Sequence, residues 1–142
     1  MLKSIVTTIG NTLVAKGISR PAAFQRAWKM ARQSKFFTKA VGVAVGNRQE
    51  ALKRLAQYGR ELVRVYLVHE SGNPTDDNAV AVVVAVVGKG EYKVGYIKAE
   101  YAALMARVID KVGGRLEAAL ENITGGVGVK RYGLNISYAL WA

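Results

Sequence analysis

The stretch ELVRVYLVHESGNPTDDNAVAVVVAVVGKGEYKVGYIK, residues 61–98, predicts three consecutive β-strands and thereby decides the fold class. Residues 61–70 alternate apolar and polar side chains, which is typical of a strand with one buried face. Residues 79–87 are valine and alanine throughout, and this composition indicates a central strand buried on both faces. Residues 88–91 supply glycines for a hairpin turn, after which residues 92–98 return antiparallel.

The polar loop between the first two strands, residues 71–78, is a candidate site. Asp76 and Asp77 are adjacent, so in an extended segment they point in opposite directions and form a poor acid–base pair. A calcium loop would need acidic residues at alternate positions and a distal bidentate glutamate. We expect Asn73 and Asn78 to build the turn with their short polar side chains.

The remaining sequence predicts three more strands and two helices around this stretch. The strands are expected at residues 40–45, 115–123 and 134–141, and the helices at residues 47–59 and 99–112. Six short strands joined mostly by tight turns favour a small OB-like or SH3-like β-barrel over a parallel doubly wound sheet. The expected fold class is mostly β with two helices: a six-stranded barrel at residues 39–142, preceded by a basic helical segment at residues 1–38.

That N-terminal segment contains one clear pattern, an amphipathic helix at residues 19–34, whereas residues 1–18 predict no definite element. Pro21 suits the first helical turn, where a missing N–H costs no hydrogen bond. The apolar face holds Phe24, Ala27, Trp28 and Ala31, and the opposite face holds Arg26, Lys29 and Arg32. The three cations are candidate phosphate contacts, and the apolar face is a candidate for packing on the main domain.

The net charge of +11 at pH 7 is unevenly distributed along the chain. Residues 1–49 hold nine Lys or Arg residues and no acidic residue, whereas the rest holds twelve basic and ten acidic residues. A basic arm on a nearly neutral domain indicates a polyanionic partner, either nucleic acid or an anionic membrane surface. An acid-free amphipathic N-terminus also resembles a mitochondrial transit peptide, so import is an alternative for a eukaryotic chain.

Composition excludes several classes of site. The chain has no cysteine, so disulfides, thiolate metal sites and cysteine nucleophiles are excluded, and a reducing compartment fits. One histidine, His69, allows no multi-histidine zinc centre and is expected to be structural. No apolar run reaches the roughly 18 residues that a membrane span needs. We expect no catalytic residue, no metal and no cofactor.

A glycine-rich tip at residues 125–133 carries a basic and aromatic cluster. Lys130, Arg131 and Tyr132 suit phosphate contacts combined with stacking on a base. The glycines resemble a phosphate cradle only superficially, because no Lys-Ser/Thr follows them. Tyr96 and Lys98 end a strand in a similar fashion and are candidates for the same face.

Several motifs together resemble the HIRAN domain over about residues 40–140. The most specific is NPTDDNAVAV at residues 73–82, which matches the family pattern N-P-x-D-x-N-A-[IV]-x-V throughout. GYI at residues 95–97 matches the following family motif, and VGV at residues 41–43 precedes a helix in the expected place.

The resemblance implies a modified OB-like barrel that binds DNA, in its best-understood members by capturing a single-stranded 3′ end. The family occurs fused to helicase-like remodelling ATPases and as stand-alone bacterial or phage proteins, and this chain resembles the stand-alone type. The implied setting is DNA repair, replication or mobile-element biology in the cytoplasm, with a helicase or repair protein as a candidate partner.

Residue by residue, the resemblance assigns Asp76 to the terminal sugar hydroxyl and places Tyr96 and Lys98 in the pocket. Arg48, Lys130 and Arg131 are then expected to supply phosphate contacts. The end-binding members have an Arg-aromatic pair and an aromatic residue at three positions that here are Ala44, Val45 and Thr75.

The expected function is therefore a non-enzymatic DNA-binding module for single strands or 3′ ends. One alternative is an interaction module in which Phe24, Trp28 and the basic helix dock a protein or a membrane surface. The other is a hydrolytic site in which Asp76, Asp77 and His69 hold a divalent ion.

Overall fold

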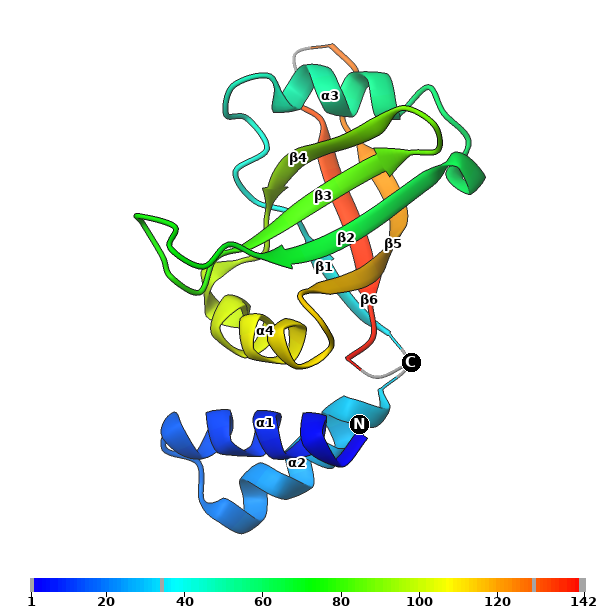
Figure 1. The fold of residues 1–142 in the computed structure, drawn as a ribbon. Helices are drawn as coiled ribbons and strands as arrows, with labels where there is room; N and C mark the ends of the chain where they lie inside the picture. Colours follow the sequence, from blue (N-terminus) through cyan, green and yellow to red (C-terminus); the bar gives the residue numbers. More distant parts are fainter. Residues whose placement is uncertain (1, 34, 129, 141–142) are drawn as a thin grey trace.

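The computed structural model describes residues 2–33, 35–128 and 130–140. Within them the chain forms four α-helices and one six-stranded antiparallel sheet (Figure 1). The helices are α1 (Leu2–Ala15), α2 (Arg20–Arg32), α3 (Arg48–Leu55) and α4 (Ala99–Lys111), with a short 3-10 turn at Arg60–Leu62. The strands are β1 (Phe36–Lys39), β2 (Val63–His69), β3 (Val80–Val86), β4 (Gly90–Tyr96), β5 (Arg115–Thr124) and β6 (Gly133–Tyr138). Ser34 and Trp141, where a helix and a strand were expected to end, lie outside the described residues.

The three strands predicted from the opening stretch are confirmed as neighbours. The sheet order is β1-β6-β5-β2-β3-β4, so β3 lies between β2 and β4. Val80, Val82 and Val84 of β3 are buried, in keeping with its apolar composition. The helix α4 packs against β2, and α3 packs against β4. The two faces of the central hairpins are thus covered by different helices.

The prediction of a closed β-barrel is wrong. β1 and β4 are the edges of the sheet, and among the described residues they approach each other through an isolated bridge between Val41 and Tyr96. The Val41 N–H donates to the Tyr96 carbonyl at 2.8 Å, and the Tyr96 N–H donates to the Val41 carbonyl at 2.9 Å. A side chain at Gly95 would place its Cβ 2.6 Å from the Val41 carbonyl oxygen, so this approach requires glycine. We call this bridge together with Gly95 the sheet seam.

The prediction of a strand at residues 40–45 is also wrong. The conformation of these residues explains why the edge of the sheet stays open. Gly42 and Gly46 have φ values of +69° and +57°, which break an extended segment. The strand lies four residues earlier, as β1, where the Phe36 ring stacks on Tyr138 of β6 with centroids 5.4 Å apart. Because β1 is so short, it cannot pair along the length of β4.

Residues 1–18, which predicted no definite element, contain α1. Ile5, Ile9 and Leu13 recur every four residues and are buried. The sequence obscures this stripe because threonine and glycine have low helix propensity. Within the helix each threonine hydroxyl donates to the carbonyl four residues earlier, which satisfies it locally.

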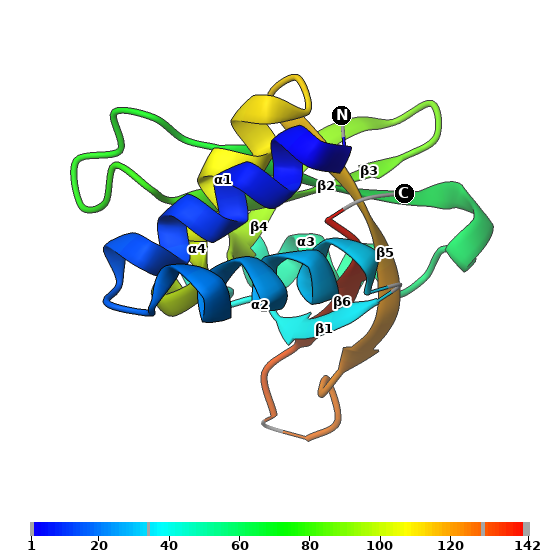
Figure 2. The same cartoon turned by 90° about the horizontal axis from the view of Figure 1, so that it is seen from below.

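The predicted amphipathic helix is confirmed as α2, but it packs on α1 rather than directly on the sheet (Figure 2). Ala23, Ala27 and Ala31 form its buried stripe, and the Phe24 ring lies over Gly10 of α1. The α1–α2 pair then lies under α4, on the opposite side of the sheet from α3 (Figure 1). In the described part of the chain no helix is long and apolar enough to cross a membrane.

Candidate functional site

The loop at residues 71–78 is shaped by its own polar side chains. Asn73 Oδ1 accepts the N–H groups of Thr75 at 2.9 Å and Asp76 at 3.2 Å, which confirms Asn73 as a turn builder. Asp76 Oδ1 accepts the N–H of Asn78 at 2.9 Å. Asn78 therefore contributes to the turn through its backbone N–H rather than through the side chain that the sequence predicted. The acceptor of that N–H is one carboxylate oxygen of Asp76.

His69 fixes this loop to α4. Its Nδ1 lies 3.0 Å from Asp110 Oδ1, and its Nε2 lies 2.7 Å from the Asp77 carbonyl oxygen. Both partners are acceptors, so only the doubly protonated imidazolium satisfies both contacts. The Asp77 carbonyl and then the Asp110 carboxylate raise the pKa of His69 above its ordinary value. His69 is thus a structural residue, and its side chain is only 14% exposed.

A cavity of about 320 Å³ lies at the sheet seam, beside this loop. It is lined by Val41, Asn73, Thr75, Asp76, Ala79, Tyr96, Ile97 and Ala99. The structure therefore brings together Asp76 and Tyr96, two of the predicted site residues, from segments that the sequence separates by a whole hairpin. Lys98 stands between two lining residues, exposed at the start of α4. We call this space the seam cavity.

A hydrogen-bonded network behind Tyr96 holds its ring in place. The Tyr96 hydroxyl donates to Glu70 Oε1 at 2.8 Å, and Lys93 Nζ donates to both Tyr96 Oη at 2.8 Å and Glu70 Oε2 at 2.9 Å. Asn73 Nδ2 also donates to Glu70 Oε1, at 3.1 Å, which ties the loop to the same group. Glu70 is therefore the common acceptor of the cavity wall.

The pKa values of this network reflect its contacts. Burial alone would raise the pKa of Glu70, but hydrogen bonds from Lys93, Tyr96 and Asn73 outweigh it and lower the pKa. The hydrogen bonds to Tyr96 and Glu70 raise the pKa of Lys93. Sequence reasoning missed Glu70 and Lys93. The one available signal was a charged residue at the end of one predicted strand and another inside the next strand but one, and only the sheet register reveals that they meet.

Arg48, a predicted phosphate contact, does not line the cavity but lies over the ring of Tyr96, which does. Its guanidinium carbon is 5.4 Å from the centroid of the Tyr96 ring, and its Nη1 donates to the Gly42 carbonyl at 2.7 Å. Five N–H donors belong to each guanidinium, so others remain available for a ligand.

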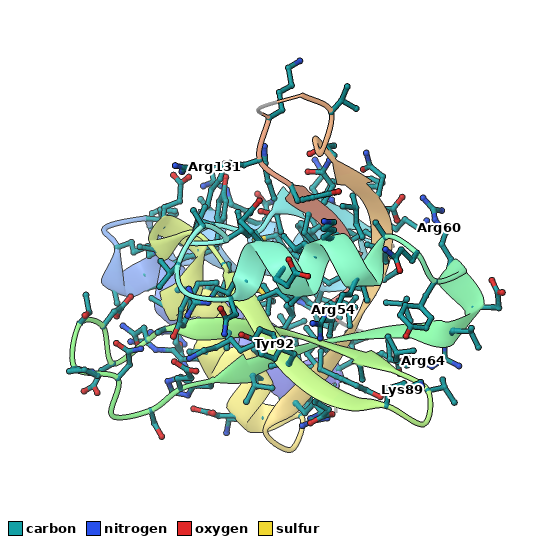
Figure 3. All side chains as sticks on the ribbon, turned by 90° about the horizontal axis from the view of Figure 1, so that it is seen from above. Arg54, Arg60, Arg64, Lys89, Tyr92 and Arg131 are labelled. Atoms are coloured by element: carbon teal, nitrogen blue, oxygen red, sulfur yellow. The ribbon has the colours of Figure 1, made fainter. Side chains whose placement is uncertain are left out.

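The predicted residues of the glycine-rich tip are joined to α3 through Gln49. Its Nε2 donates to the Tyr132 carbonyl at 2.9 Å, and its Oε1 accepts the Tyr132 N–H at 2.7 Å. Lys130 and Arg131 are exposed, and Figure 3 shows Arg131 near the N-terminal end of α3. The Tyr132 ring instead lies against Gly126, so one ring face is covered by the tip itself.

The predicted arm contacts are exposed but far from this cavity. Arg26, Lys29 and Arg32 lie on α2, whereas α3 and the tip lie at the opposite end of the molecule (Figure 1). The Arg32 guanidinium carbon stands 4.8 Å from the Trp28 ring centroid. The Trp28 ring on α2 is thus already engaged by a cation of the same helix.

The groups required for the hydrolytic alternative are otherwise engaged. The Asp77 carboxylate accepts the Gly72 N–H at 3.2 Å, and His69 faces Asp110 and a backbone carbonyl. In residues 2–33, 35–128 and 130–140 no three His, Asp or Glu side chains gather into a possible metal site.

Comparison with known proteins gives one match. A family model described as the HIRAN domain matches residues 34–139. This range contains the whole sheet, α3, α4 and the seam cavity, while α1 and α2 precede it. No curated protein and no solved structure matches the chain.

Proposed function

The chain belongs to the HIRAN domain family, generally a DNA-end or single-strand binding module, and on that premise we propose that its seam cavity binds the 3′ end of single-stranded DNA. HIRAN domains are typically non-catalytic, and we assign the chain a binding role in DNA repair, replication or mobile-element biology. The observation that carries the proposal is the seam cavity itself. Asp76 and Tyr96 both line it, and the Arg48 guanidinium lies over the Tyr96 ring.

The chemistry of the cavity suits a terminal sugar with a free hydroxyl. An ionised carboxylate only accepts hydrogen bonds, so Asp76 would accept a 3′-hydroxyl and repel a 3′-phosphate. Val41, Ile97 and Ala79 offer apolar walls for the sugar and base. The phosphate that precedes the terminal nucleotide would contact Arg48.

Lys98 and the start of α4 would serve the same phosphate. The first N–H groups of a helix have no partner within the helix, and the helix dipole favours an anion there. Ala99, the first residue of α4, lines the cavity. Arg131, near the N-terminal end of α3 (Figure 3), and its sequence neighbour Lys130 would contact phosphates further along the strand.

The absence of aromatic side chains at three positions predicts weak selectivity among bases. Ala44, Val45 and Thr75 provide no ring for stacking on the terminal base. Stacking is worth about 1–3 kcal/mol per base in single-strand binders, so affinity would depend more on the sugar and the phosphates. The proposal is therefore recognition of an end rather than of a sequence.

The test is a titration of labelled single strands that end in a 3′-hydroxyl or a 3′-phosphate, at two salt concentrations. We expect tighter binding of the hydroxyl end, and a log–log salt slope of about −0.7 per phosphate contacted. Asp76→Asn should weaken the 3′-hydroxyl complex by about tenfold, in line with a hydrogen bond to a charged group. Asp77→Asn is the matched control and should bind as the wild type does. Equal affinity for both ends would contradict the end-binding proposal, and a flat salt response would contradict DNA binding as such.

A second candidate function rests on the basic face of α2, which would dock an anionic membrane or an acidic partner protein. Arg26, Lys29 and Arg32 are exposed there, and residues 1–49 contain no acidic side chain to neutralise them. The triple variant Arg26→Ala, Lys29→Ala, Arg32→Ala distinguishes the two. If binding to anionic vesicles is lost while 3′-end recognition persists, the arm has its own partner.

A further inference from the structure

A second and larger cavity, of about 610 Å³, lies between α3 and the β3–β4 hairpin. It is lined by Asn47, Glu50, Ala51, Arg54, Leu55, Tyr58, Val84, Val86, Lys89, Gly90, Glu91 and Tyr92. None of these residues lines the seam cavity. We call this space the α3 groove.

The α3 groove combines an apolar floor with aromatic and cationic edges. Leu55, Val84 and Val86 supply the floor. Tyr58 and Tyr92 are 38% and 44% exposed, so both rings are accessible to a ligand. A ring that is half in solvent and half on an apolar floor can stack on a base without prior rearrangement.

Cations gather along the groove and at its far end. Arg54 and Lys89 line it, and Figure 3 shows Arg60 and Arg64 toward the C-terminal end of α3. Arg64 Nη1 donates to two backbone carbonyls, that of Glu61 at 3.3 Å and that of Val63 at 3.5 Å. The groove therefore leads into a basic region that the seam does not use.

Two acidic residues also line the groove, and both are paired. Glu91 receives two hydrogen bonds from Arg115, at 2.6 and 3.2 Å. Glu50 lies 3.6 Å from Arg54 across one turn of α3, with both side chains more than half exposed. An exposed pair of this kind contributes little, so a phosphate can replace Glu50 as the partner of Arg54.

The groove and the seam cavity share β4, and α3 extends from beside Tyr96 into the groove. β4 carries Tyr96 at the seam and Tyr92 in the groove, and α3 carries Arg48 at one end and Arg54 near the other. Four residues of a strand span roughly 13 Å, which about four stacked nucleotides at ~3.4 Å each would cover. A strand whose end lies in the seam cavity can thus continue along α3.

We propose that the α3 groove binds the single-stranded segment that continues from the end held in the seam cavity. Tyr58 and Tyr92 stack on its bases, and Arg54 and Lys89 contact its phosphates. This inference rests on the proposed function and extends it, because it gives the chain a binding length beyond the terminal nucleotide and a direction along α3.

The experiment compares oligothymidylates of about 2 and about 12 nucleotides. The shorter one ends before the groove, and the longer one lies within the range that small single-strand modules cover. The wild type should bind the longer strand more tightly. The double variant Lys89→Ala, Tyr92→Ala should lose about tenfold or more for the longer strand and leave the shorter one unchanged. Its salt slope on the longer strand should fall by about 0.7, for one lost phosphate contact.

The matched control is Phe37→Ala with Lys111→Ala, which removes one exposed ring and one exposed cation outside both cavities. It should bind both strands as the wild type does. If the control and groove variants lose affinity equally, or if length brings no gain, the groove inference is overturned while end binding stands. If the wild type binds neither strand, the proposed function fails and this inference with it. If the groove variant binds both strands normally, the groove takes another occupant, such as a polypeptide.

Discussion

The sheet seam and the α1–α2 pair are both polar surfaces, but they are organised in opposite ways. At the seam, Glu70, Lys93 and Tyr96 are bonded to one another and hold a shaped cavity. On the α1–α2 pair, cations such as Arg26 and Lys29 face solvent with no acidic residue on either helix. The exposed cations of the α1–α2 pair can attract an anion but do not form a shaped site. The side chains at the seam hold one another in place by hydrogen bonds, and such a site can select its ligand.

The largest effect should come from the seam glycine. Gly95→Ala would bring a Cβ to 2.6 Å from the Val41 carbonyl, a backbone atom that cannot move without opening the bridge. We expect the free energy of unfolding to fall by about 3 kcal/mol, the upper range for overpacking, with loss of 3′-end binding. Denaturant unfolding measures the first and oligonucleotide titration the second.

The counterpart on the α1–α2 pair is Gly10→Ala, whose Cβ would approach the Phe24 ring at 2.7 Å. A half-exposed ring can turn aside, and alanine favours a helix by up to about 1 kcal/mol over glycine. The net change should stay within about 1 kcal/mol. A larger loss for Gly10→Ala than for Gly95→Ala would contradict the comparison.

The next effect concerns the shared acceptor of the seam. Glu70→Gln leaves Lys93 without its charged partner, so we expect a loss of about 1–2 kcal/mol of stability. Because the pKa of Glu70 is lowered on folding, its contribution is present above the ordinary carboxyl pKa and is lost as pH falls through the folded value. Unfolding curves from neutral to acid pH should show that loss in the wild type and not in the variant. Glu117→Gln, an exposed position on β5, is the control and should leave the loss intact.

The third effect is the titration of His69. Its pKa is raised on folding, so its contribution is fully present below the ordinary histidine value and is lost as pH rises through the folded value. We expect about 1 kcal/mol, the scale of one hydrogen bond. The chain has one histidine, so His69→Gln should abolish this alkaline-side loss entirely. The protection of the Asp77 and Asn78 amides relative to their intrinsic exchange rates should fall over the same pH window. Unchanged protection would contradict the attachment of the loop to α4 through His69.

The smallest effect on stability should come from the arm. Replacing Arg26, Lys29 and Arg32 with alanine removes exposed charges, and such changes usually stay within about 0.5 kcal/mol. If the arm contacts phosphates, the salt slope of DNA binding should fall by up to about 2. An unchanged slope would show that those cations make no phosphate contact in the DNA complex.

Much of the fold was predictable because periodicity is local. The strands β2, β3 and β4 and the helices α2, α3 and α4 follow directly from alternation, spacing and turn residues. The helix α1 was missed because its threonines and glycine hide a stripe that needs α2 and α4 to stabilise it. The barrel prediction failed because Gly42 and Gly46 have positive φ values and break the extended segment after β1, so that β1 does not continue along β4.

The site was predictable only where one residue carries the chemistry. Asp76 follows from the loop motif, and Tyr96 from the motif after it. Glu70 and Lys93 were out of reach, since their meeting depends on the register that pairs Ala81 with Tyr96 and shifts between Val82 and Val83. The α3 groove likewise depends on how α3 packs on β4, which no periodicity encodes.

The seam has a consequence for how the chain acquires its activity. Val41 and Tyr96 are far apart in sequence, with α3, β2 and β3 between them. Closing a long loop costs conformational entropy, so contacts between distant segments form after local hairpins. The β2–β3–β4 hairpins can assemble by themselves, whereas the seam needs them complete before Val41 returns to β4. A refolding chain should therefore regain the β2–β3–β4 hairpins before the seam and its ligand binding, and a nascent chain could not bind its ligand until Tyr96 has been made.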